Sequence, residues 1–445
     1  MKRVATMLIV LSFFWLAGSA QGRTWHIKSD GSGDAPTIQA AIDSAAVGDS
    51  VAVNEGTYFE NIVLKIGVKV LGGWNSSFTL RDPQAYTTTI DGLAKGSVVA
   101  AYWPVDSTSV IDGFLITNGC GTEDPMNPGV HLGGGIFVYW TPGPTITNNQ
   151  IRGNRVVTNG GGAGISIHDA APIVRGNLIV ENSCPEHYAF GAGIKLGNSG
   201  GQISGNVIAN NNAGGDGGGL RADGGTFLFV DNEVFGNTSG INGGGLSLDH
   251  SLAYIGRNKI TGNVASALGG GIFGYAISSD VEWNVIADNS AGSGGGMLFL
   301  ASPFPTVSHN TMVENSSREA GQVSLGEGCS PLVEANIVAR DLQGLGIFYM
   351  PGCSPTFVCN DVWGNAWGNY EGSCGDQTGV NGNISTDPKF CDPSNYDFHL
   401  CENSPCAPGH HPSGANCVLI GALDVGCAPT AVQETTWGKI KAMFR

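Results

Sequence analysis

The stretch GGGLSLDHS, residues 243–251, places three glycines before a short alternating run that ends in an acid and a histidine. Similar glycine clusters recur along the chain, and the apolar residues that follow them are spaced by 24 to 29 positions. These apolar residues are Ile136, Ile165, Ile194, Leu220, Leu246, Ile272, Met297, Val323 and Ile347. A regular spacing of this length predicts one structural unit that is repeated along the chain.

A second pattern, N-x-[IVM]-x-x-N, keeps the same period. Its first asparagines are Asn149, Asn177, Asn206, Asn232, Asn258, Asn284 and Asn310. We expect the closing asparagine of each motif, such as Asn237 or Asn263, to turn the chain in the left-handed region, which asparagine tolerates. In stacked coils about 4.8 Å apart, these amides would hydrogen-bond to one another as a ladder.

Apolar residues alternate within each unit, as in Leu246-Ser247-Leu248, and this is the period of a β-strand. A unit of about 26 residues holds three short strands with their turns, and such strands bury a face only by stacking on the next unit. The sequence therefore predicts an all-β solenoid, a parallel β-helix of about ten to twelve coils. Leucine-rich repeats have a similar period, but their leucine spacing and helical segments are absent.

The composition limits the partners of the protein. Its 445 residues include 70 glycines, only 13% are charged, and the net charge is −16. This acidity argues against nucleic acid and anionic membranes as partners. A polyanionic sugar would need Ca²⁺ or a local basic patch in order to bind, so Ca²⁺ is the one cofactor that the composition suggests. We expect a monomer.

The chain divides into five segments. Residues 1–20 have a basic start at Lys2 and Arg3, an apolar run and small residues before position 21, which predicts a signal peptide and a secreted or cell-surface protein. No later stretch is long and apolar enough to span a bilayer. We expect an N-terminal cap and first coil at 21–66, repeats at 67–370, a cysteine-rich cap at 371–427 and a tail at 428–445.

Nine of the eleven cysteines lie between Cys329 and Cys427. Clustered cysteines in an exported chain predict disulfides that stabilise the C-terminal cap. Cys329 and Cys353 occupy matching places in EGCSP and PGCSP, and stacked coils would bring their Cα atoms near 5 Å. Cys359 and Cys374 are candidates to close the next loop.

The N-terminal residues carry a resemblance to a known family. Residues 36–46 predict a short helix, VAVNEGTYFEN at 51–61 and GVKVLGG at 67–73 predict strands, and NISTDPKFCDPSNYDFHL begins at Asn383. With the 26-residue units, these segments resemble the pectin-lyase-like right-handed parallel β-helix superfamily over about four fifths of the chain. The resemblance implies a helix that covers the first coil and a substrate groove on one sheet face. The superfamily's signature motifs for polygalacturonases, pectin methylesterases and uronate epimerases are absent.

The glycine register predicts which side chains face outward. If Ile165 and Ile167 point inward, the residues between and after them point outward, and stacking brings them together on one face. The candidate catalytic residues are His168, Lys195, Arg221, Asp223, Asp249 and His250. The candidate substrate-binding residues are Asp169, Tyr139, Trp140, Phe273 and Tyr275.

These residue types suit a polysaccharide or cell-surface glycan. Aromatic rings stack on sugars, Arg and Lys bind carboxylates, and a lyase base could be Arg221, Lys195 or His250. A hydrolase would instead use two carboxylates such as Asp223 and Asp249, about 5 to 9 Å apart. The alternative is a non-catalytic surface, adhesion or structural protein, in which the charged pairs only stabilise the sheet.

Overall fold

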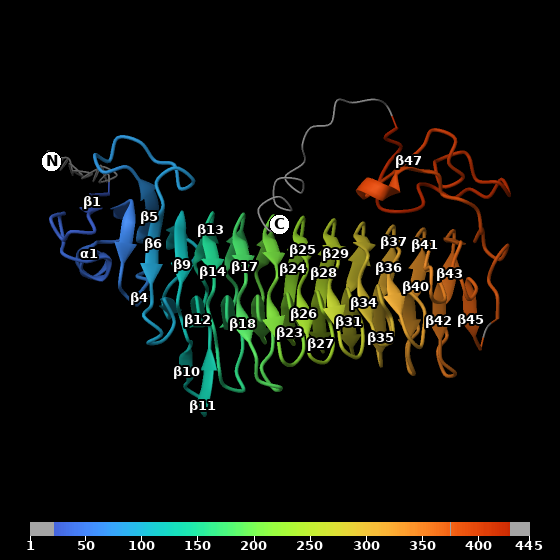
Figure 1. Cartoon of the computed structure of the whole chain (residues 1–445), viewed down its shortest axis with the longest axis horizontal. Helices are drawn as coiled ribbons and strands as arrows, with labels where there is room; N and C mark the ends of the chain where they lie inside the picture. The colour runs from blue at the N-terminus through green and yellow to red at the C-terminus, as the bar shows by residue number, and fades with distance from the viewer. Residues whose placement is uncertain (1–21, 374, 428–445) are drawn as a thin grey trace, which may run out of the picture.

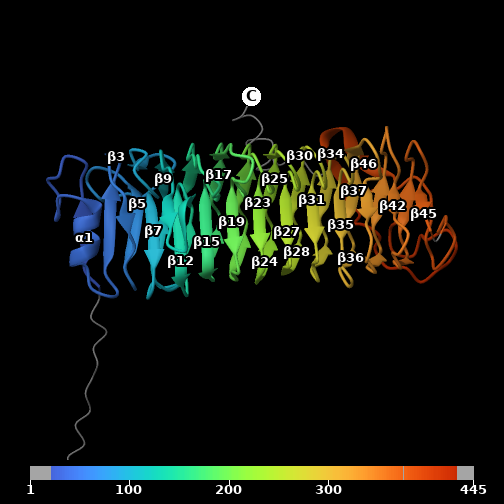
Figure 2. The ribbon, with the colours of Figure 1, turned by 90° about the horizontal axis from the view of Figure 1, so that it is seen from below.

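The computed structural model describes residues 22–373 and 375–427. These residues form one elongated solenoid in which short parallel strands stack from the N-terminal helix to the C-terminal segment (Figures 1 and 2). Within the described ranges the longest sheet has 13 strands, so the solenoid has about 13 coils. This is slightly more than the ten to twelve predicted, because the coils before Ile136 lack the glycine clusters.

Three long sheets form the walls of the solenoid. Sheet A consists of β1 (Thr24–Ile27), β2 (Ser50–Asn54), β5 (Lys69–Trp74), β8 (Val110–Asp112), β13 (Thr145–Thr147), β16 (Ile173–Arg175), β20 (Gln202–Ser204), β24 (Thr226–Val230), β28 (Leu252–Gly256), β32 (Asp280–Glu282), β36 (Thr306–Ser308), β40 (Leu332–Glu334) and β43 (Thr356–Val358). Sheet B consists of β3 (Gly56–Tyr58), β6 (Thr88–Asp91), β9 (Phe114–Thr117), β14 (Gln150–Arg152), β17 (Leu178–Val180), β21 (Val207–Ala209), β25 (Glu233–Phe235), β29 (Lys259–Thr261), β33 (Val285–Ala287), β37 (Thr311–Val313), β41 (Ile337–Ala339) and β44 (Asp361–Trp363).

Sheet C carries the predicted site and faces the viewer in Figure 2. It consists of β4 (Ile62–Val63), β7 (Val99–Tyr102), β12 (Ile136–Thr141), β15 (Ile165–Ala170), β19 (Ile194–Gly197), β23 (Leu220–Asp223), β27 (Leu246–Asp249), β31 (Ile272–Tyr275), β35 (Met297–Leu300), β39 (Val323–Leu325), β42 (Ile347–Tyr349) and β45 (Tyr370–Gly372). A shorter sheet contains β18 (Ser183–Cys184), β22 (Asn212–Ala213), β26 (Thr238–Ser239), β30 (Val264–Ala265), β34 (Ser290–Ala291) and β38 (Ser316–Ser317). Two antiparallel hairpins are present as well. The first, β10 (Thr122–Asp124) with β11 (Asn127–Leu132), extends from one coil. The second, β46 (Phe390–Asp392) with β47 (Asp397–Leu400), lies in the C-terminal segment, and the short helix η1 (Pro393–Asn395) joins its strands.

The register of sheet C confirms the predicted repeat. Every apolar residue of the glycine column, from Ile136 to Ile347, pairs directly with the next one in the column. Their side chains are buried in one continuous core that fills the inside of the solenoid. Because each coil is too small to bury a face alone, this shared core is what makes the coils cooperative.

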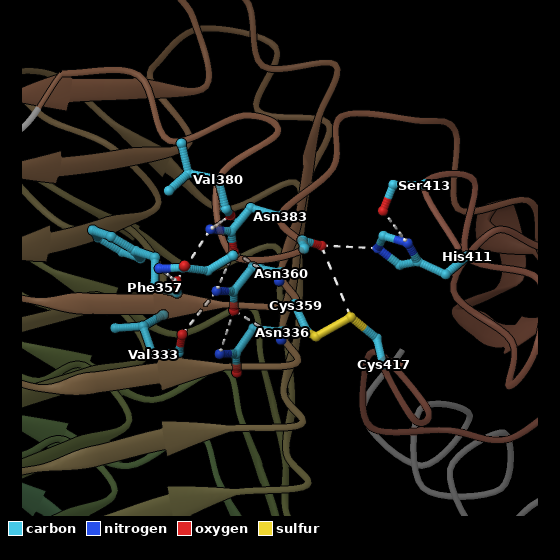
Figure 3. The surroundings of a disulfide bond; sticks show 12 residues. Val333, Asn336, Phe357, Cys359, Asn360, Val380, Asn383, His411, Ser413 and Cys417 are labelled. Carbon is cyan, nitrogen blue, oxygen red and sulfur yellow. Dashed lines mark hydrogen bonds between the residues drawn. A yellow bond between two sulfur atoms is a disulfide. The ribbon is translucent and has the colours of Figure 1, made fainter. Parts of the chain in front are cut away.

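Two ladders of buried asparagines connect the coils: the predicted ladder of closing asparagines, such as Asn237 and Asn263, and a second ladder of the first asparagines of each motif. Asn258 donates from its Nδ2 atom to the carbonyl oxygen of Phe229 and to Oδ1 of Asn284, both at 2.9 Å. The same Oδ1 atom accepts from the backbone N–H of Asn258 at 2.9 Å, so each amide joins its own coil to the next. Figure 3 shows the C-terminal end of this ladder at Asn336, Asn360 and Asn383.

The predicted left-handed conformation of the closing asparagines is wrong. The left-handed residue is the one before the asparagine, such as Gly236 and Gly262, each with φ of 63°. The turn residue faces solvent, whereas Asn237 and Asn263 must extend their side chains into the ladder. The ladder and the turn therefore use adjacent positions.

Asn258→Ala tests the ladder. The change leaves buried backbone and amide groups without partners, so we expect the free energy of unfolding to fall by about 1–3 kcal/mol. Chemical denaturation monitored by circular dichroism measures this loss. Asn212→Ala is the matched control, because Asn212 is exposed and lies outside both ladders; an equal loss in the two variants would contradict the role of the ladder.

The glycine corners cover part of sheet C. Gly243 has φ of 63°, and a Cβ added there would lie 2.6 Å from the Cβ of Ser247. The corner therefore lies directly over the first outward residue of the strand that follows it, and Ser247 is fully buried. A side chain at position 243 would collide with this residue, which explains why the corner is glycine.

A short helix covers the first coil, as the resemblance implied. Helix α1 (Ile38–Ser44) lies within the predicted range 36–46 and contacts β1, β2 and β4. Its residues Ile38, Ala41 and Ile42 are buried against the core. The carboxylate of Glu60 accepts the backbone N–H groups of Ile38 and Gln39, which satisfies the start of the helix. No helix in the described ranges is long and apolar enough to cross a membrane.

The C-terminal segment folds back along the side of the solenoid. Figure 1 shows β47 above the strands β37 and β41. The backbone N–H of Gly421 donates to the carbonyl oxygen of Ala335 at 2.8 Å, and the hydroxyl of Tyr396 donates to Asp288 at 2.8 Å. Contacts between residues more than 80 positions apart therefore attach this segment to sheet B.

Among the described residues, two disulfides join cysteines of the C-terminal region, as predicted, but with different pairings. Cys359 bonds to Cys417, not to Cys374, and Figure 3 shows this bond linking the last coils to the folded-back segment. Cys374 itself lies outside the described residues. The second disulfide joins Cys391 to Cys427.

The predicted disulfide between Cys329 and Cys353 is not formed. The Sγ atom of Cys329 lies 3.3 Å from the carbonyl oxygen of Phe299, and that of Cys353 lies 2.7 Å from the carbonyl oxygen of Gly326. Both sulfur atoms point to backbone carbonyls of neighbouring coils. The matching sequence positions of the two cysteines therefore did not bring their sulfur atoms together.

A buried carboxyl group under this segment should make stability depend on pH. Asp361 accepts the backbone N–H of Thr386 at 3.0 Å and the thiol of Cys406 at 3.1 Å, and burial raises its pKa to about 7. An unfolded aspartate has a pKa of about 3.9, so the folded chain keeps a proton that the unfolded chain has released. Raising the pH from about 4 to about 7 therefore destabilises the folded protein.

Asp361→Asn removes this titration. We expect the Tm of the wild type to fall relative to that of the variant as the pH rises through that window. Above the window the difference between the two Tm values should stay constant. Glu402→Gln, at an exposed position, should leave the pH profile of the wild type unchanged. An identical profile for Asp361→Asn and wild type would contradict the assignment.

Candidate functional site

The predicted site residues form two neighbouring columns on sheet C, as the glycine register indicated. The first column runs through Phe137, Ser166, Lys195, Arg221, Ser247 and Phe273. The second column runs through Tyr139, His168, Gly197, Asp223, Asp249 and Tyr275. The residue that follows the second column has a left-handed backbone conformation in several coils, with φ of 46–47° at Trp140, Asp169 and His250.

The glycine corners bury most of the first column. Phe137 and Ser247 are fully buried, and Phe273 lies under Gly269, whose added Cβ would be 2.8 Å from its Cα. The prediction that Phe273 stacks on a ligand is therefore wrong, because the corner of its own coil covers it. The second column lies beyond the corners and carries the accessible groups.

Arg221 is the centre of a charged cluster. Its Nε atom donates to Asp223 at 2.7 Å, and its Nη2 atom donates to Asp249 at 2.9 Å. Its Nη1 atom donates to Asp216 at 3.1 Å and to Ser247 at 2.9 Å. These bonds engage all three guanidinium nitrogens, so Arg221 orients three carboxylates and has little capacity left for a substrate or a proton.

The three carboxylates differ in their access to solvent. Asp216 is mostly buried, and burial raises its pKa even though Arg221 acts in the opposite direction. The side chains of Asp223 and Asp249 are 40% and 30% exposed. Asp249 also contacts Nδ1 of the exposed His250, whose ring centroid lies 5.6 Å from that of Tyr275. The accessible oxygens of Asp223 and Asp249 are therefore acceptors held in fixed positions.

This donor set does not fit Ca²⁺. Calcium prefers six to eight oxygen ligands around one point. Asp216, Asp223 and Asp249 are the acidic side chains that surround Arg221, and the guanidinium of Arg221 occupies the point between them. Among the described residues, only Cys391, Cys401 and Cys427 lie close enough together to share a metal, and a disulfide already uses two of them.

Lys195, His168 and Ser166 form a second polar group beside Arg221. Lys195 contacts the ring of Phe190 with its Nζ atom 5.8 Å from the centroid, and it forms no hydrogen bond or ion pair with a described residue. Burial lowers the pKa of Lys195, and burial with the charge of Lys195 lowers the pKa of His168 to about 4. The Nε2 atom of His168 and the hydroxyl of Ser166 lack hydrogen-bond partners within the described ranges.

His168 reaches over the neighbouring coil. Its partner in the register is Gly197, and a Cβ added to Gly197 would lie 2.5 Å from the Nδ1 atom of His168. The absence of a side chain at position 197 therefore makes room for the imidazole. Asp124 of the β10–β11 hairpin lies close enough for its charge to act on both His168 and Lys195.

Exposed aromatic rings flank the two polar groups. Trp140 is 66% exposed and Tyr275 is 41% exposed, whereas Tyr139 is partly buried and stacks on Phe137 at 5.6 Å between centroids. Asp169 is exposed and accepts the side-chain amide of Asn198 at 2.7 Å. Trp140 and Tyr275 stand at the two ends of the polar strip.

Sequence reasoning missed Asp216, Ser247 and Trp103. Asp216 interrupts the glycine run at 214–219. An acidic residue inside a glycine corner is visible in the sequence, so the sequence did contain a signal for Asp216. Trp103 is 65% exposed and follows β7, which pairs with β12. The β10–β11 hairpin lengthens that coil and hides the correspondence of Trp103 with Trp140.

Comparisons with known proteins agree with the fold. A family model described as a right handed beta helix region matches residues 134–311. This match agrees with the topology described above, which is that of a right-handed parallel β-helix. No curated protein sequence matches it.

Several solved structures align with this chain at low identity. Pectate lyase Pel9A is 14% identical, with a TM-score of 0.47 over 92% of this chain and 97% of that chain. DFA-IIIase from Arthrobacter chlorophenolicus A6, in complex with GF2, is 16% identical, with a TM-score of 0.44 over 73% and 87%. A mutant tailspike of E. coli bacteriophage HK620, in complex with a pentasaccharide, is 13% identical, with a TM-score of 0.26 over 78% and 76%. Likeness at this level does not assign an activity to this chain.

Arg221→Met and Lys195→Met test whether the charge of Arg221 stabilises the fold more than the charge of Lys195 does. Removing Arg221 leaves the mostly buried Asp216 and two partly exposed carboxylates without their counter-ion. We expect unfolding to become easier by roughly 3 kcal/mol, the low end for breaking a buried ion pair. Lys195→Met removes an unpaired cation and should cost less than about 1 kcal/mol. Equal losses in thermal or urea denaturation would contradict this distinction.

Proposed function

We propose that this chain is an exported protein that binds a neutral, hydroxyl-rich polysaccharide along sheet C between β12 and β31. The observation that carries the proposal is the pair of partly exposed carboxylates, Asp223 and Asp249, which Arg221 holds in place between exposed aromatic rings. Sugar hydroxyls donate well to fixed carboxylates, and aromatic faces cover the apolar side of a sugar ring.

The charge of the face favours a neutral ligand. Arg221 is neutralised by its three aspartates, Asp124 adds negative charge near Lys195, and Asp169 adds negative charge near His168. The net charge of the whole chain is −16. A polyanion would be repelled by this surface. The two disulfides of the C-terminal region support export, because such bonds persist in oxidising compartments.

Hydrolysis has weaker support than binding. A glycosidase needs one protonated carboxylic acid and one carboxylate on either side of the bond. Asp223 and Asp249 form ion pairs with the same Nη2 atom of Arg221, so the cluster does not distinguish one of them as the acid. Arg221 is equally unsuited to act as a base, because its N–H groups are engaged.

Lys195 favours a second candidate function, cleavage by β-elimination. Its neutral amine would take the proton next to a uronate carboxylate, the C–H electrons would form a C=C bond, and the glycosidic C–O bond would break as solvent protonates the leaving oxygen. The lowered pKa of Lys195 increases the neutral fraction of this base. The rate would therefore rise with pH through that lowered pKa.

The test measures binding and cleavage together. Affinity electrophoresis in gels that contain neutral or uronate polysaccharides should show retardation by a neutral polymer, with no new reducing ends or unsaturated products with or without Ca²⁺. Asp249→Asn should weaken binding roughly ten- to hundredfold, the range for losing a hydrogen bond to a charged group.

Asp231→Asn is the matched control, because Asp231 pairs with Arg257 away from sheet C. No retardation by any polysaccharide would overturn the proposal. Unsaturated products that depend on Lys195 would replace it with the lyase.

A further inference from the structure

We infer that Trp103, Trp140 and Asp169 form a separate subsite that binds one neutral sugar ring of the proposed polysaccharide. This inference rests on the proposed function and places a ligand contact outside the Arg221 cluster. Trp103, Trp140, Asp169 and the small residues around them line one shallow, mainly apolar hollow. The other residues of the lining are Thr141, Pro142, Ala170 and Ala171.

The two indoles present open faces. Trp103 and Trp140 are 65% and 66% exposed, and their ring centroids lie 6.4 Å apart with planes tilted by 46°. Because the rings do not stack face to face, neither hides the other from a ligand. Two large apolar rings that remain exposed on neighbouring coils are costly in water unless another surface covers them.

The backbone holds this pair in place. Trp140 has φ of 47°, a left-handed conformation that a bulky residue adopts less readily than glycine or asparagine. The equivalent position is left-handed in the following coils as well, at Asp169, Asn198, Gly224, His250, Ala276 and Ala301. The turn at Trp140 therefore belongs to the repeated fold, and it holds the exposed indole at a fixed place on the surface.

Further hydrogen bonds fix the loops that carry the rings. The backbone N–H of Val105 donates to the carbonyl oxygen of Tyr102 at 2.9 Å, and that of Gly143 donates to the carbonyl oxygen of Val105 at 3.1 Å. The N–H of Ala171 donates to the carbonyl oxygen of Pro142 at 3.2 Å. These bonds connect the three neighbouring loops around the hollow. The rings are thus preorganised, which lowers the entropy cost of binding.

Asp169 identifies the chemistry of the occupant. Its carboxylate stands at the rim of the apolar hollow and is oriented by the amide of Asn198 at 2.7 Å. Indole faces with one carboxylate acceptor fit a ring that has an apolar face and hydroxyl groups at its edge. A uronate in the same place would bring a second carboxylate beside Asp169 with no cation among the lining residues, so the ring is a neutral sugar.

The position of the hollow agrees with a chain-like ligand. Trp140 precedes Lys195 by two coils, or roughly 10 Å along the solenoid. A polysaccharide that reaches Asp223 and Asp249 would pass this hollow in the direction of the N-terminal coils. The subsite would therefore determine how the ligand is placed along sheet C.

Calorimetric titration with neutral oligosaccharides of the polymer that wild type binds tests the subsite. Trp103→Ala and Trp140→Ala should each weaken binding about tenfold, whereas Trp140→Phe should keep most of the affinity. Asp169→Asn should weaken binding less than either alanine variant. Trp367→Ala is the matched control, because Trp367 is also exposed but lies in a different hollow, with Arg318 and Leu342.

The outcomes separate the two proposals. If both alanine variants bind as wild type does while Asp249→Asn loses affinity, the subsite is wrong and the proposed function stands. Tighter binding of a uronate oligosaccharide through Trp103 and Trp140 would also overturn the neutral subsite. If wild type binds no polysaccharide at all, both proposals are wrong.

Discussion

The stacking of successive coils in one register, held by buried asparagine amides, is the constraint on which the rest of the structure depends. Each amide satisfies a carbonyl group of the previous coil and accepts an N–H group of a neighbouring one. Because the ladders determine where every coil begins, residues about 26 positions apart become neighbours about 4.8 Å apart. Arg221 meets Asp249 for this reason alone, and the same register aligns Trp103 with Trp140.

The glycine corners then decide which outward residues are available. A corner such as Gly243 lies over the first outward position and buries it, while the second outward position stays accessible. The buried position of β23 holds Arg221, and the accessible positions beside it hold Asp223 and Asp249. A buried cation below exposed carboxylates is thus a direct consequence of the repeat. The cation neutralises the acids and also fixes their orientation.

The sequence predicted the features that follow from the repeat and missed those that depend on contacts between distant segments. The solenoid, the core column, the ladders and the grouping of Arg221 with Asp249 all follow from the period. The partner of Cys359 could not be predicted, because it depends on a segment that folds back over sheet B. Burial of Phe273 was missed because the alternation of a strand indicates a face but does not indicate what covers it. Asp216 lies in a corner, where no alternation applies.

Under the proposed function, the same geometry lets an acidic protein present a strongly polar face to a neutral ligand. The charge of Arg221 is neutralised within its own cluster, and Lys195 is partly buried beside a neutral His168. What remains for a ligand is a row of oriented acceptors with indole and phenol rings at its ends. Directional acceptors and apolar ring faces select shape and hydroxyl pattern and do not select charge. A repeated sheet face is well suited to this, because its groups recur at intervals along the axis on which a polymer would lie.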